Sequence, residues 1–467
     1  MSPIATINPA TGEAIRTFSA LAPPAIEEKL QLAAASAVSW RKSPMSQRVQ
    51  LLVSLAEHLE SDAAALGALM TLEMGKLHSA AVAEVNKCAT ACRFYAEHGE
   101  SLLAPEPQAS DKDEVLIRYE PLGVVLAVMP WNFPFWQVIR FAAPAVMAGN
   151  VVLLKHASNV PQCAQAIERL FARAGAPAGV FQTLLVGSET VSSLISDPRV
   201  AAVTLTGSEA AGAKVAAAAG EAIKPAVLEL GGSDAFIVMP TADLDAAVKA
   251  GVHARTMNNG QSCIAAKRFI VHEAIADAFE AKFVSAMKAL VVGDPMQAET
   301  DLGPLATPQG VKDLERQIGE SVRQGARLAL GGRAIPGAGN YFEATVLTNV
   351  SRGAPAYDEE MFGPAAVIHR VGGVDEAIHL ANDTAFGLGA SAWTADRGEA
   401  EQFARGIEAG SVFINAMVAS DPRYPFGGIK RSGYGRELGV YGIRAFTNVK
   451  TVHLAWASGT GGLPGTE

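Results

Sequence analysis

The sequence predicts an α/β protein with more than one domain, built on parallel, doubly wound sheets. Three observations support this class. The chain has 467 residues, which is too long for a single hydrophobic core. From residue 124 to 230, short runs rich in Val, Leu and Ala alternate with helical patterns, as in parallel strands joined by helices. A second alternation of this kind starts at residue 235.

The N-terminal hundred residues are expected to be mainly helical. Apolar residues recur there at three- and four-residue spacing, which predicts helices at 25–40, 46–61 and 80–97. These helices would cover a sheet made by the next part of the chain. Its expected strands are 124–129, 151–154, 182–186, 200–205 and 226–230, and its helices are 137–148, 160–174, 190–196 and 210–219.

The second alternation predicts another α/β unit. Its expected strands are 235–238, 268–272, 367–369, 390–393 and 411–415, and its helices are 244–258, 275–291, 307–324 and 374–382. Two further segments, 115–121 and 445–453, are β-rich but too polar for a core. Exposed strands tend to pair, so we expect them to pair with each other or across subunits. The tail 457–467, rich in Gly, Ser and Thr, is expected to be flexible.

Composition narrows the function classes. A net charge of −9 and the lack of a basic run argue against a nucleic-acid or membrane-surface protein. The N-terminus lacks the pattern of a secretion signal, and only four cysteines are present, which together favour a reducing cytoplasm. No spacing of Cys and His predicts a metal site.

A polar segment, Asn258–Cys263, ends in a cysteine that could act as a nucleophile. A thiol attacks only as the thiolate, so it needs a base or a favourable electrostatic site. Glu229 ends an apolar run before two glycines and could be that base, directly or through a water. Taken alone, a single cysteine is more often buried and inert.

Polar residues also follow the predicted strands, where open α/β sheets bind ligands. Asn132 could donate to an oxyanion, although asparagine is also common in turns. Lys155 and Ser158 suit a ribose or a phosphate, although a solvated loop lysine would look the same.

The segment Thr206–Gly212 makes a small-residue turn into a helix N-terminus, which suits a pyrophosphate, although it is not a Gly-x-Gly-x-x-Gly fingerprint. Glu360 and Phe362 precede a Gly-Pro turn, and an ordinary acidic turn would have the same sequence.

Six motifs in order resemble those of the aldehyde dehydrogenase superfamily, over almost the whole chain. They are Pro-Trp-Asn-Phe-Pro (130–134), Leu-Thr-Gly-Ser (205–208), Glu-Leu-Gly-Gly (229–232), Gly-Gln-Ser-Cys (260–263), Glu-Glu-Met-Phe-Gly-Pro (359–364) and Pro-Phe-Gly-Gly-Ile-Lys-Arg-Ser-Gly (425–433).

The resemblance implies a mechanism without a metal. Cys263 would attack the aldehyde carbon, while the Asn132 side chain and the Cys263 backbone N–H hold the oxyanion. Hydride would pass from the thiohemiacetal to a nicotinamide, and Glu229 would activate the water that hydrolyses the thioester.

It also implies cofactor contacts. Lys155 would bind the adenosine ribose, Gly207 and Ser208 the pyrophosphate, and Glu360 the nicotinamide ribose. Phe362, Trp131 and Leu230 would line the cofactor path. NAD-specific members often carry a glutamate where this chain has Ser158. Losing that carboxylate removes repulsion against a 2′-phosphate, so we expect NADP to be accepted alongside NAD.

The implied domains are a Rossmann-type cofactor domain (1–110 and 121–228), a catalytic domain (229–425) and a small β arm (111–120 with 426–456). The arm predicts a homodimer or homotetramer.

Within the superfamily the chain is most similar to bacterial succinate-semialdehyde dehydrogenases. Arg140 and Ser420 match an arginine and a serine that in this group help to hold the substrate carboxylate. Arg268 matches an arginine of some members, and Met257 replaces a further arginine. An anionic aldehyde needs a cation near the pocket mouth, and Arg140 is the expected one, although a surface helix arginine would have the same pattern. Glutarate semialdehyde or another short aldehyde remains an alternative, because one methylene is rejected only weakly. Less favoured are a CoA-acylating member, which would commonly lack Glu229, and a non-catalytic structural paralogue.

Overall fold

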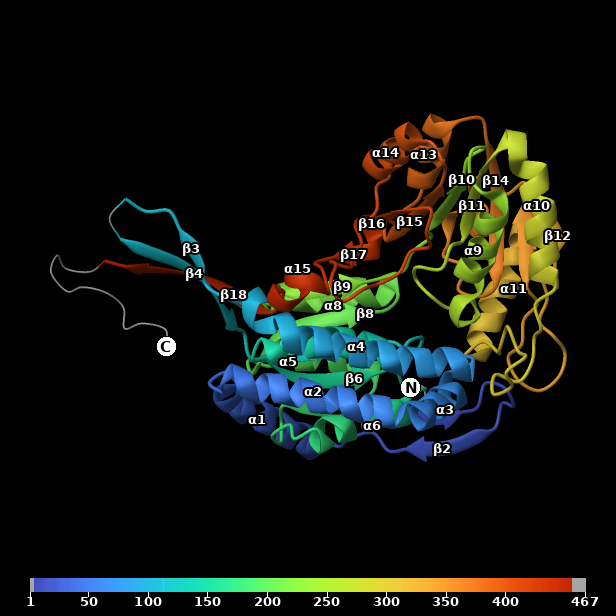
Figure 1. Ribbon diagram of the computed structural model, residues 1–467. Coiled ribbons are helices and arrows are strands. Elements are labelled where there is room, and N and C mark those ends of the chain that lie inside the picture. The colour runs from blue at the N-terminus through green and yellow to red at the C-terminus, as the bar shows by residue number, and fades with distance from the viewer. Residues whose placement is uncertain (1–3, 112, 456–467) are drawn as a thin grey trace.

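The computed structural model describes residues 4–111 and 113–455 (Figure 1). The expected flexible tail at 457–467 lies outside the described residues. Within them the strands form sheets of six, seven, three and two strands. The smallest is the N-terminal hairpin of β1 (Ile4–Ile7) and β2 (Ala14–Phe18). None of the described helices is both long and apolar enough to cross a membrane.

The six-stranded sheet has the order β17-β9-β8-β5-β6-β7, and all its strands except β17 are parallel. Buried aliphatic runs form its centre, as the sequence predicts, and β5 has the expected bounds. The strands are β5 (Val124–Met129), β6 (Val151–His156), β7 (Phe181–Thr183), β8 (Val200–Thr206), β9 (Ala226–Glu229) and β17 (Gly433–Tyr434).

Two layers of helices accompany this sheet (Figure 1). Those that contact its strands are α1 (Pro23–Trp40), α5 (Trp136–Met147), α6 (Pro161–Arg173), α7 (Val191–Ser196) and α8 (Glu209–Glu221). An outer layer is made by α2 (Met45–Ser61), α3 (Ala63–Met74) and α4 (His78–Leu102). Every residue of α5 is buried, because the helix lies between the sheet and α4.

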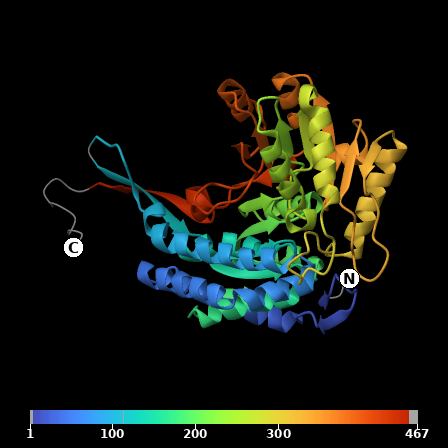
Figure 2. The same ribbon diagram turned by 45° about the vertical axis from the view of Figure 1, so that its right-hand side comes forward.

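The seven-stranded sheet, of order β12-β13-β14-β11-β10-β15-β16, forms the second unit, and only β12 is antiparallel (Figure 2). Its strands are β10 (Ala235–Val238), β11 (Arg268–His272), β12 (Arg327–Leu330), β13 (Thr345–Thr348), β14 (Ala365–Val371), β15 (Gly389–Trp393) and β16 (Ser411–Ile414). Its helices are α9 (Leu244–Thr256), α10 (Glu273–Lys288), α11 (Pro308–Arg323), α12 (Pro355–Asp358), α13 (Val374–Asn382) and α14 (Arg397–Gly406).

A three-stranded sheet projects from the body (Figures 1 and 2). Its strands are β3 (Glu106–Gln108), β4 (Glu114–Pro121) and β18 (Thr447–Leu454). Residues 114–121 pair with 454–447 in antiparallel register, which confirms that the two exposed strands pair with each other. Within the described part of the expected arm segment, residues 426–455, only β18 belongs to this sheet. By contrast, β17 extends the six-stranded sheet, and α15 (Gly439–Arg444) contacts α5.

Candidate active site

The loop that carries Cys263 joins α9 to β11 through a strained turn. Asn258, Asn259 and Gly260 have φ values of 55°, 57° and 75°. Asparagine and glycine tolerate this left-handed region better than other residues. A Cβ atom at residue 260 would lie 2.3 Å from the backbone of Gly363, so only glycine fits there. The turn places Cys263 between the two large sheets.

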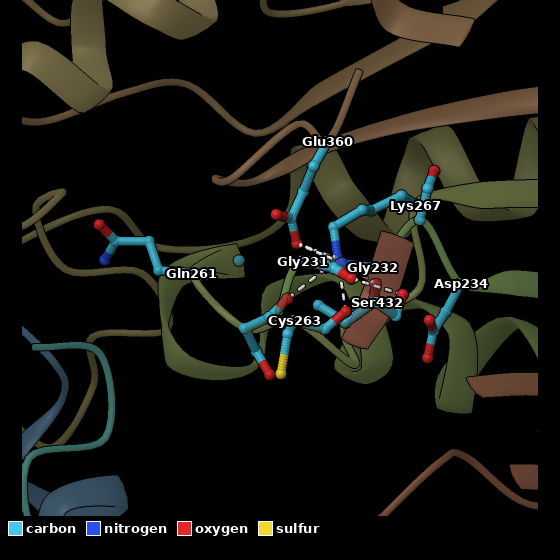
Figure 3. Close-up of polar contacts among 12 residues, drawn as sticks. Gly231, Gly232, Asp234, Gln261, Cys263, Lys267, Glu360 and Ser432 are labelled. Carbon is cyan, nitrogen blue, oxygen red and sulfur yellow. Dashed lines mark hydrogen bonds and ion pairs between the residues drawn. The ribbon is translucent and has the colours of Figure 1, made fainter. Parts of the chain in front are cut away.

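Lys267 holds the backbone of this loop (Figure 3). Its buried ammonium donates to the carbonyl oxygens of Ser262, Cys263 and Ala265 at 3.0, 2.9 and 3.0 Å. The same ammonium lies 3.4 Å from Glu360 Oε1, and that oxygen accepts the Gly232 N–H at 3.0 Å. A network of this kind fixes the position of the cysteine before any ligand arrives.

Cys263 opens onto a cavity of about 260 Å³, here called the thiol cavity. It lies at the carboxyl ends of β5, β8 and β9, where this class of sheet binds ligands. Eight of the expected site residues share its wall: Trp131, Asn132, Gly207, Ser208, Leu230, Cys263, Glu360 and Phe362. Pro130, Gln137, Thr206 and Gly231 complete it.

The Asn132 side chain is held in one orientation. Its Oδ1 accepts from Gln137 Nε2 at 3.0 Å, and its Nδ2 donates to the Gln261 carbonyl oxygen at 3.1 Å. An amide nitrogen carries two N–H bonds, so one remains for a ligand in the cavity. Both Asn132 and Gln137 line that cavity, which suits the amide to bind a developing oxyanion.

Protein surrounds the Cys263 thiol on most sides, and the part of the residue that remains exposed faces the cavity. Burial raises its pKa to about 12, and the nearby positive charges of Arg140 and Lys267 oppose this rise. The resting group is therefore the protonated thiol at neutral pH. Attack requires that the proton leave at the moment of reaction.

Glu229 is buried at the end of β9, and neither of its oxygens has a hydrogen-bond partner within the described chain. Its Oε1 lies over Gly427, where a Cβ would come within 2.6 Å. Burial raises its pKa well above the usual range, and the buried carboxylate of Glu437 raises it further, against the pull of Arg140. Glu229 therefore holds a proton at a higher pH than an ordinary glutamate.

The thiol cavity suits the phosphate and ribose groups of a nicotinamide cofactor. Ser208 caps α8 by accepting the Ala211 N–H, and the first turn of that helix opens at the cavity edge with Gly207. Helix N-termini of this kind bind pyrophosphate. The Glu360 carboxylate can accept from ribose hydroxyls, and the rings of Trp131 and Phe362 meet edge to face at 5.8 Å beside it.

Comparison with known proteins assigns the family. The family model described as "Aldehyde dehydrogenase family" matches residues 1–452. The chain belongs to the aldehyde dehydrogenase family. It is 56% identical to a probable succinate-semialdehyde dehydrogenase [NADP(+)] of Synechocystis sp., over 97% of this chain and 100% of that one. It is 54% identical to succinate-semialdehyde dehydrogenase [NADP(+)] 1 of Mycobacterium tuberculosis, again over 97% and 100%.

Solved structures agree with this assignment. A succinic semialdehyde dehydrogenase from Streptococcus pyogenes, in complex with NADP+ as the cofactor, is 38% identical to this chain with a TM-score of 0.95. The match covers 97% of this chain and 99% of that one. The α/β architecture is therefore the aldehyde dehydrogenase fold.

Two expected cofactor residues of this aldehyde dehydrogenase lie outside the wall of the thiol cavity. Lys155 is the second-last residue of β6 and is buried, which lowers its pKa, while the charge of Glu189 opposes that effect. Ser158 follows it and is only partly buried, and its carbonyl oxygen accepts the Ala5 N–H. Both stand at the carboxyl end of β6, the neighbour of β5 in the sheet.

The three expected substrate residues have different surroundings. Arg140 is buried and ion-paired with Glu437, and its guanidinium lies 4.7 Å from the centroid of Phe426. Ser420 Oγ accepts from Lys87 Nζ of α4 at 2.8 Å and from Trp136 Nε1 of α5 at 3.1 Å. Arg268 is buried, and its guanidinium donates at 2.8 Å to the carbonyl oxygens of Ser233, Leu380 and Ala381. These contacts indicate that Arg268 stabilises the fold, and the residue is not in the wall of the thiol cavity.

Sequence reasoning missed three residues that shape the site. Gln137 orients Asn132, Lys267 fixes the cysteine loop, and Glu437 faces Glu229 across Arg140. Gln137 follows Asn132 by five residues on the first turn of α5, so the helical pattern could have suggested it. No local signal identifies Lys267 or Glu437, because their roles come from contacts made in the folded state.

Proposed function

We propose that the protein oxidises succinate semialdehyde to succinate through a Cys263 thiohemiacetal and thioester, with NADP as cofactor and NAD also accepted. One observation carries this proposal. The thiol of Cys263 and the amide of Asn132 share one cavity with the Gly207–Ser208 turn and Glu360. That arrangement offers a nucleophile, an oxyanion donor and a cofactor seat together. The printed names of the relatives support the choice of aldehyde and cofactor.

The residues act in the following order. Cys263 attacks the aldehyde carbon, and the oxyanion forms against the free N–H of Asn132 Nδ2. The Cys263 backbone N–H, which has no acceptor within the described chain, is the second donor. Lys267 keeps the Cys263 backbone in place through the Ser262 and Cys263 carbonyl oxygens, and Gln137 keeps the Asn132 side chain in place. Donors fixed in advance stabilise the developing charge without reorganisation.

When bound, the nicotinamide cofactor supplies the hydride acceptor. Glu229 then takes a proton from the water that hydrolyses the thioester. The Glu229 carboxylate lies against Gly427 and near the Arg140–Glu437 pair. It has no hydrogen bond to Cys263 within the described residues. It therefore reaches the thioester by rotation of its side chain or through a water.

Lys155 and Ser158 are proposed to select the cofactor. An ammonium and a hydroxyl at the end of β6 can both donate to a 2′-phosphate, and no glutamate stands at residue 158 to repel it.

We also propose a homodimer or homotetramer and a cytoplasmic location. The projecting sheet supports the first, because β18 forms its edge and most of its side chains are exposed. The reactive thiol supports the second, since all four cysteines are free and Cys263 must stay reduced. Cell fractionation tests the location; recovery of the enzyme only in a secreted or membrane fraction would contradict it.

The test of the reaction is steady-state turnover with succinate semialdehyde and with its uncharged analogue butanal, each with NADP and with NAD. We expect a kcat/KM for the charged aldehyde higher by roughly 10-fold or more. Equal values would contradict the substrate, and failure with NADP would contradict the role of Ser158.

Two variants test the chemistry in the same assay. Cys263→Ala is expected to abolish turnover, and retained oxidation would contradict the covalent mechanism. Glu229→Gln is expected to release one burst of reduced cofactor and then stall at the thioester. Full turnover of that variant would mean that another base activates the water.

A further inference from the structure

His156 is a buried histidine between the ends of two neighbouring strands. It is the last residue of β6, directly after Lys155, and is 5% exposed. Its partner in the sheet is Met129, the last residue of β5. Residues 130–134, here called the oxyanion segment because they carry Asn132, begin directly after that strand. The imidazole therefore lies where the end of β6 meets the oxyanion segment.

The hydrogen bonds of His156 define its tautomer. Its Nδ1 accepts the backbone N–H of Ala157 at 2.9 Å, so this nitrogen carries no proton. The proton is then on Nε2, which donates to the carbonyl oxygen of Pro134 at 2.9 Å. The Met129 carbonyl oxygen lies 3.2 Å from Nδ1 and would accept from it only if the ring carried a second proton. Burial lowers the pKa of His156 to about 4, so the ring is neutral at neutral pH.

The Pro134 carbonyl oxygen depends on this bond. The carbonyl oxygens on either side of it, those of Phe133 and Phe135, accept N–H groups at the start of α5 at 3.1 and 2.9 Å. No backbone N–H donates to the Pro134 oxygen within residues 4–111 and 113–455. Pro134 is buried, and a buried carbonyl without a partner is costly. His156 supplies the missing donor from outside the helix.

The other contacts of the oxyanion segment come from other directions. The Asn132 carbonyl oxygen accepts from Asn258 Nδ2 at 2.7 Å. Just after the segment, Glu84 accepts both backbone N–H groups of residues 135–136 at 2.9 Å. His156 adds the contact from β6, two residues away from the amide that is proposed to hold the oxyanion.

The position of an oxyanion donor decides how well it works. Such a donor stabilises the transition state only when it stands where the charge develops, and a misplacement of about 1 Å can cost about 100-fold in rate. Without the Nε2–H of His156, the Pro134 carbonyl must turn toward another donor, because burial without one is unfavourable. The short chain between Pro134 and Asn132 carries that movement to the amide.

We propose that His156 is a positioning residue for the oxyanion: through the Pro134 carbonyl it sets where the Asn132 amide stands beside Cys263. This inference rests on the function proposed above and deepens it. His156 does not touch the reacting atoms. Because it follows Lys155 directly, the same ring also ties the oxyanion segment to the proposed cofactor-selecting end of β6.

Three substitutions separate the two hydrogen bonds of the ring. His156→Phe keeps a ring and loses both bonds. His156→Asn keeps an acceptor near the place of Nδ1 but is too short to reach Pro134, whereas His156→Gln can place an amide N–H where Nε2 stands. The control is His369→Phe on β14, at another buried histidine, whose Nε2 has no hydrogen-bond partner within the described chain.

The readout is the burst of p-nitrophenolate released from p-nitrophenyl acetate. Acylation of Cys263 by this ester forms an oxyanion but needs neither an aldehyde nor a cofactor. We expect the burst rate to fall by about 10- to 100-fold in His156→Phe and His156→Asn. In His156→Gln and His369→Phe it should stay close to that of wild type. Alkylation of Cys263 by iodoacetamide forms no oxyanion, so its rate should stay close to wild type in all four variants.

The two rates separate positioning from a general loss of structure. An unchanged burst rate in His156→Asn would overturn the proposal, as would a His156→Gln variant as slow as His156→Asn. An alkylation rate that falls in step with the burst rate would also overturn it, because the thiol itself would then be disturbed. If His156→Phe does not fold, the comparison of His156→Asn with His156→Gln decides.

The ester assay also separates this inference from the proposed substrate. A wild type without a preference for succinate semialdehyde would contradict the substrate alone, because the ester assay uses no aldehyde. A burst that persists in Cys263→Ala would overturn the covalent mechanism and this inference with it.

Discussion

Glu229 and Glu437 are two buried carboxylates that share one arginine. Each is less than 5% exposed, and Arg140 makes its ion pair with Glu437. Burial raises the pKa of both groups, and the charge of Glu437 adds to the effect on Glu229. The charge of Glu437 thus raises the pKa of Glu229, the proposed base, and we assign Glu437 as a positioning residue on that ground.

The variant Glu437→Gln should shift the pH dependence of thioester hydrolysis. The proposed hydrolysis needs Glu229 without its proton, so its rate is full above the pKa of Glu229 and is lost as the pH falls through that pKa. Removing the Glu437 charge also frees Arg140 for Glu229, and both effects lower that pKa. We expect the acidic limb of kcat to move down by about one pH unit, which is about 1.4 kcal/mol.

The measurement is a kcat profile between pH 5.5 and 9, under conditions where a burst of reduced cofactor shows that hydrolysis is limiting. Glu100→Gln, at an exposed carboxylate of α4, is the control. A limb that stays in place or moves to higher pH would contradict this role of Glu437.

At the scale of elements, the segment from η2 (Met257–Gly260) to β11 depends on one buried ammonium. Lys267→Met removes one donor from each of three carbonyl oxygens and removes the positive charge beside Glu360. Breaking a buried ionic contact in this way costs about 3–5 kcal/mol of unfolding free energy. We also expect a lower kcat, because Cys263 loses its fixed position.

Urea unfolding of Lys267→Met against wild type gives the stability change, and the matched control is Lys288→Met at an exposed lysine of α10. Equal midpoints for wild type and Lys267→Met would show that the loop keeps its structure without the ammonium.

Elements also show what the sequence could predict. Buried β-branched and aromatic runs place β5, β10 and β11 at their predicted bounds, because these strands are buried on both faces. The edge strand β12 has only four residues and none of them is buried, so it has no such pattern, and β12, β13 and α14 were not predicted. Eight of the expected site residues share one cavity because strand-end loops converge. Lys267 and Glu437 have no local signal in the sequence, since their partners lie in other elements or are backbone atoms.

At the scale of the whole molecule, the three-stranded arm stands away from both large sheets (Figure 1). A small sheet of this size is marginal alone, so its stability should come from contact with another surface. Its edge strand β18 carries Val449, which is 61% exposed and is an unusual residue for a solvated edge. A second copy of the chain is the proposed cover.

The variant Val449→Lys should weaken the assembly, because a charged side chain on an edge strand blocks pairing and desolvation. Size-exclusion chromatography with light scattering is expected to show wild type at two or four times the mass of one chain, and Val449→Lys at a lower mass or dissociating at higher concentration. Val291→Lys, at a valine 47% exposed after α10, should behave as wild type. A wild-type protein that elutes with the mass of a single chain would contradict the proposed assembly. Equal masses for wild type and Val449→Lys would instead place the contact elsewhere on the arm or on the body.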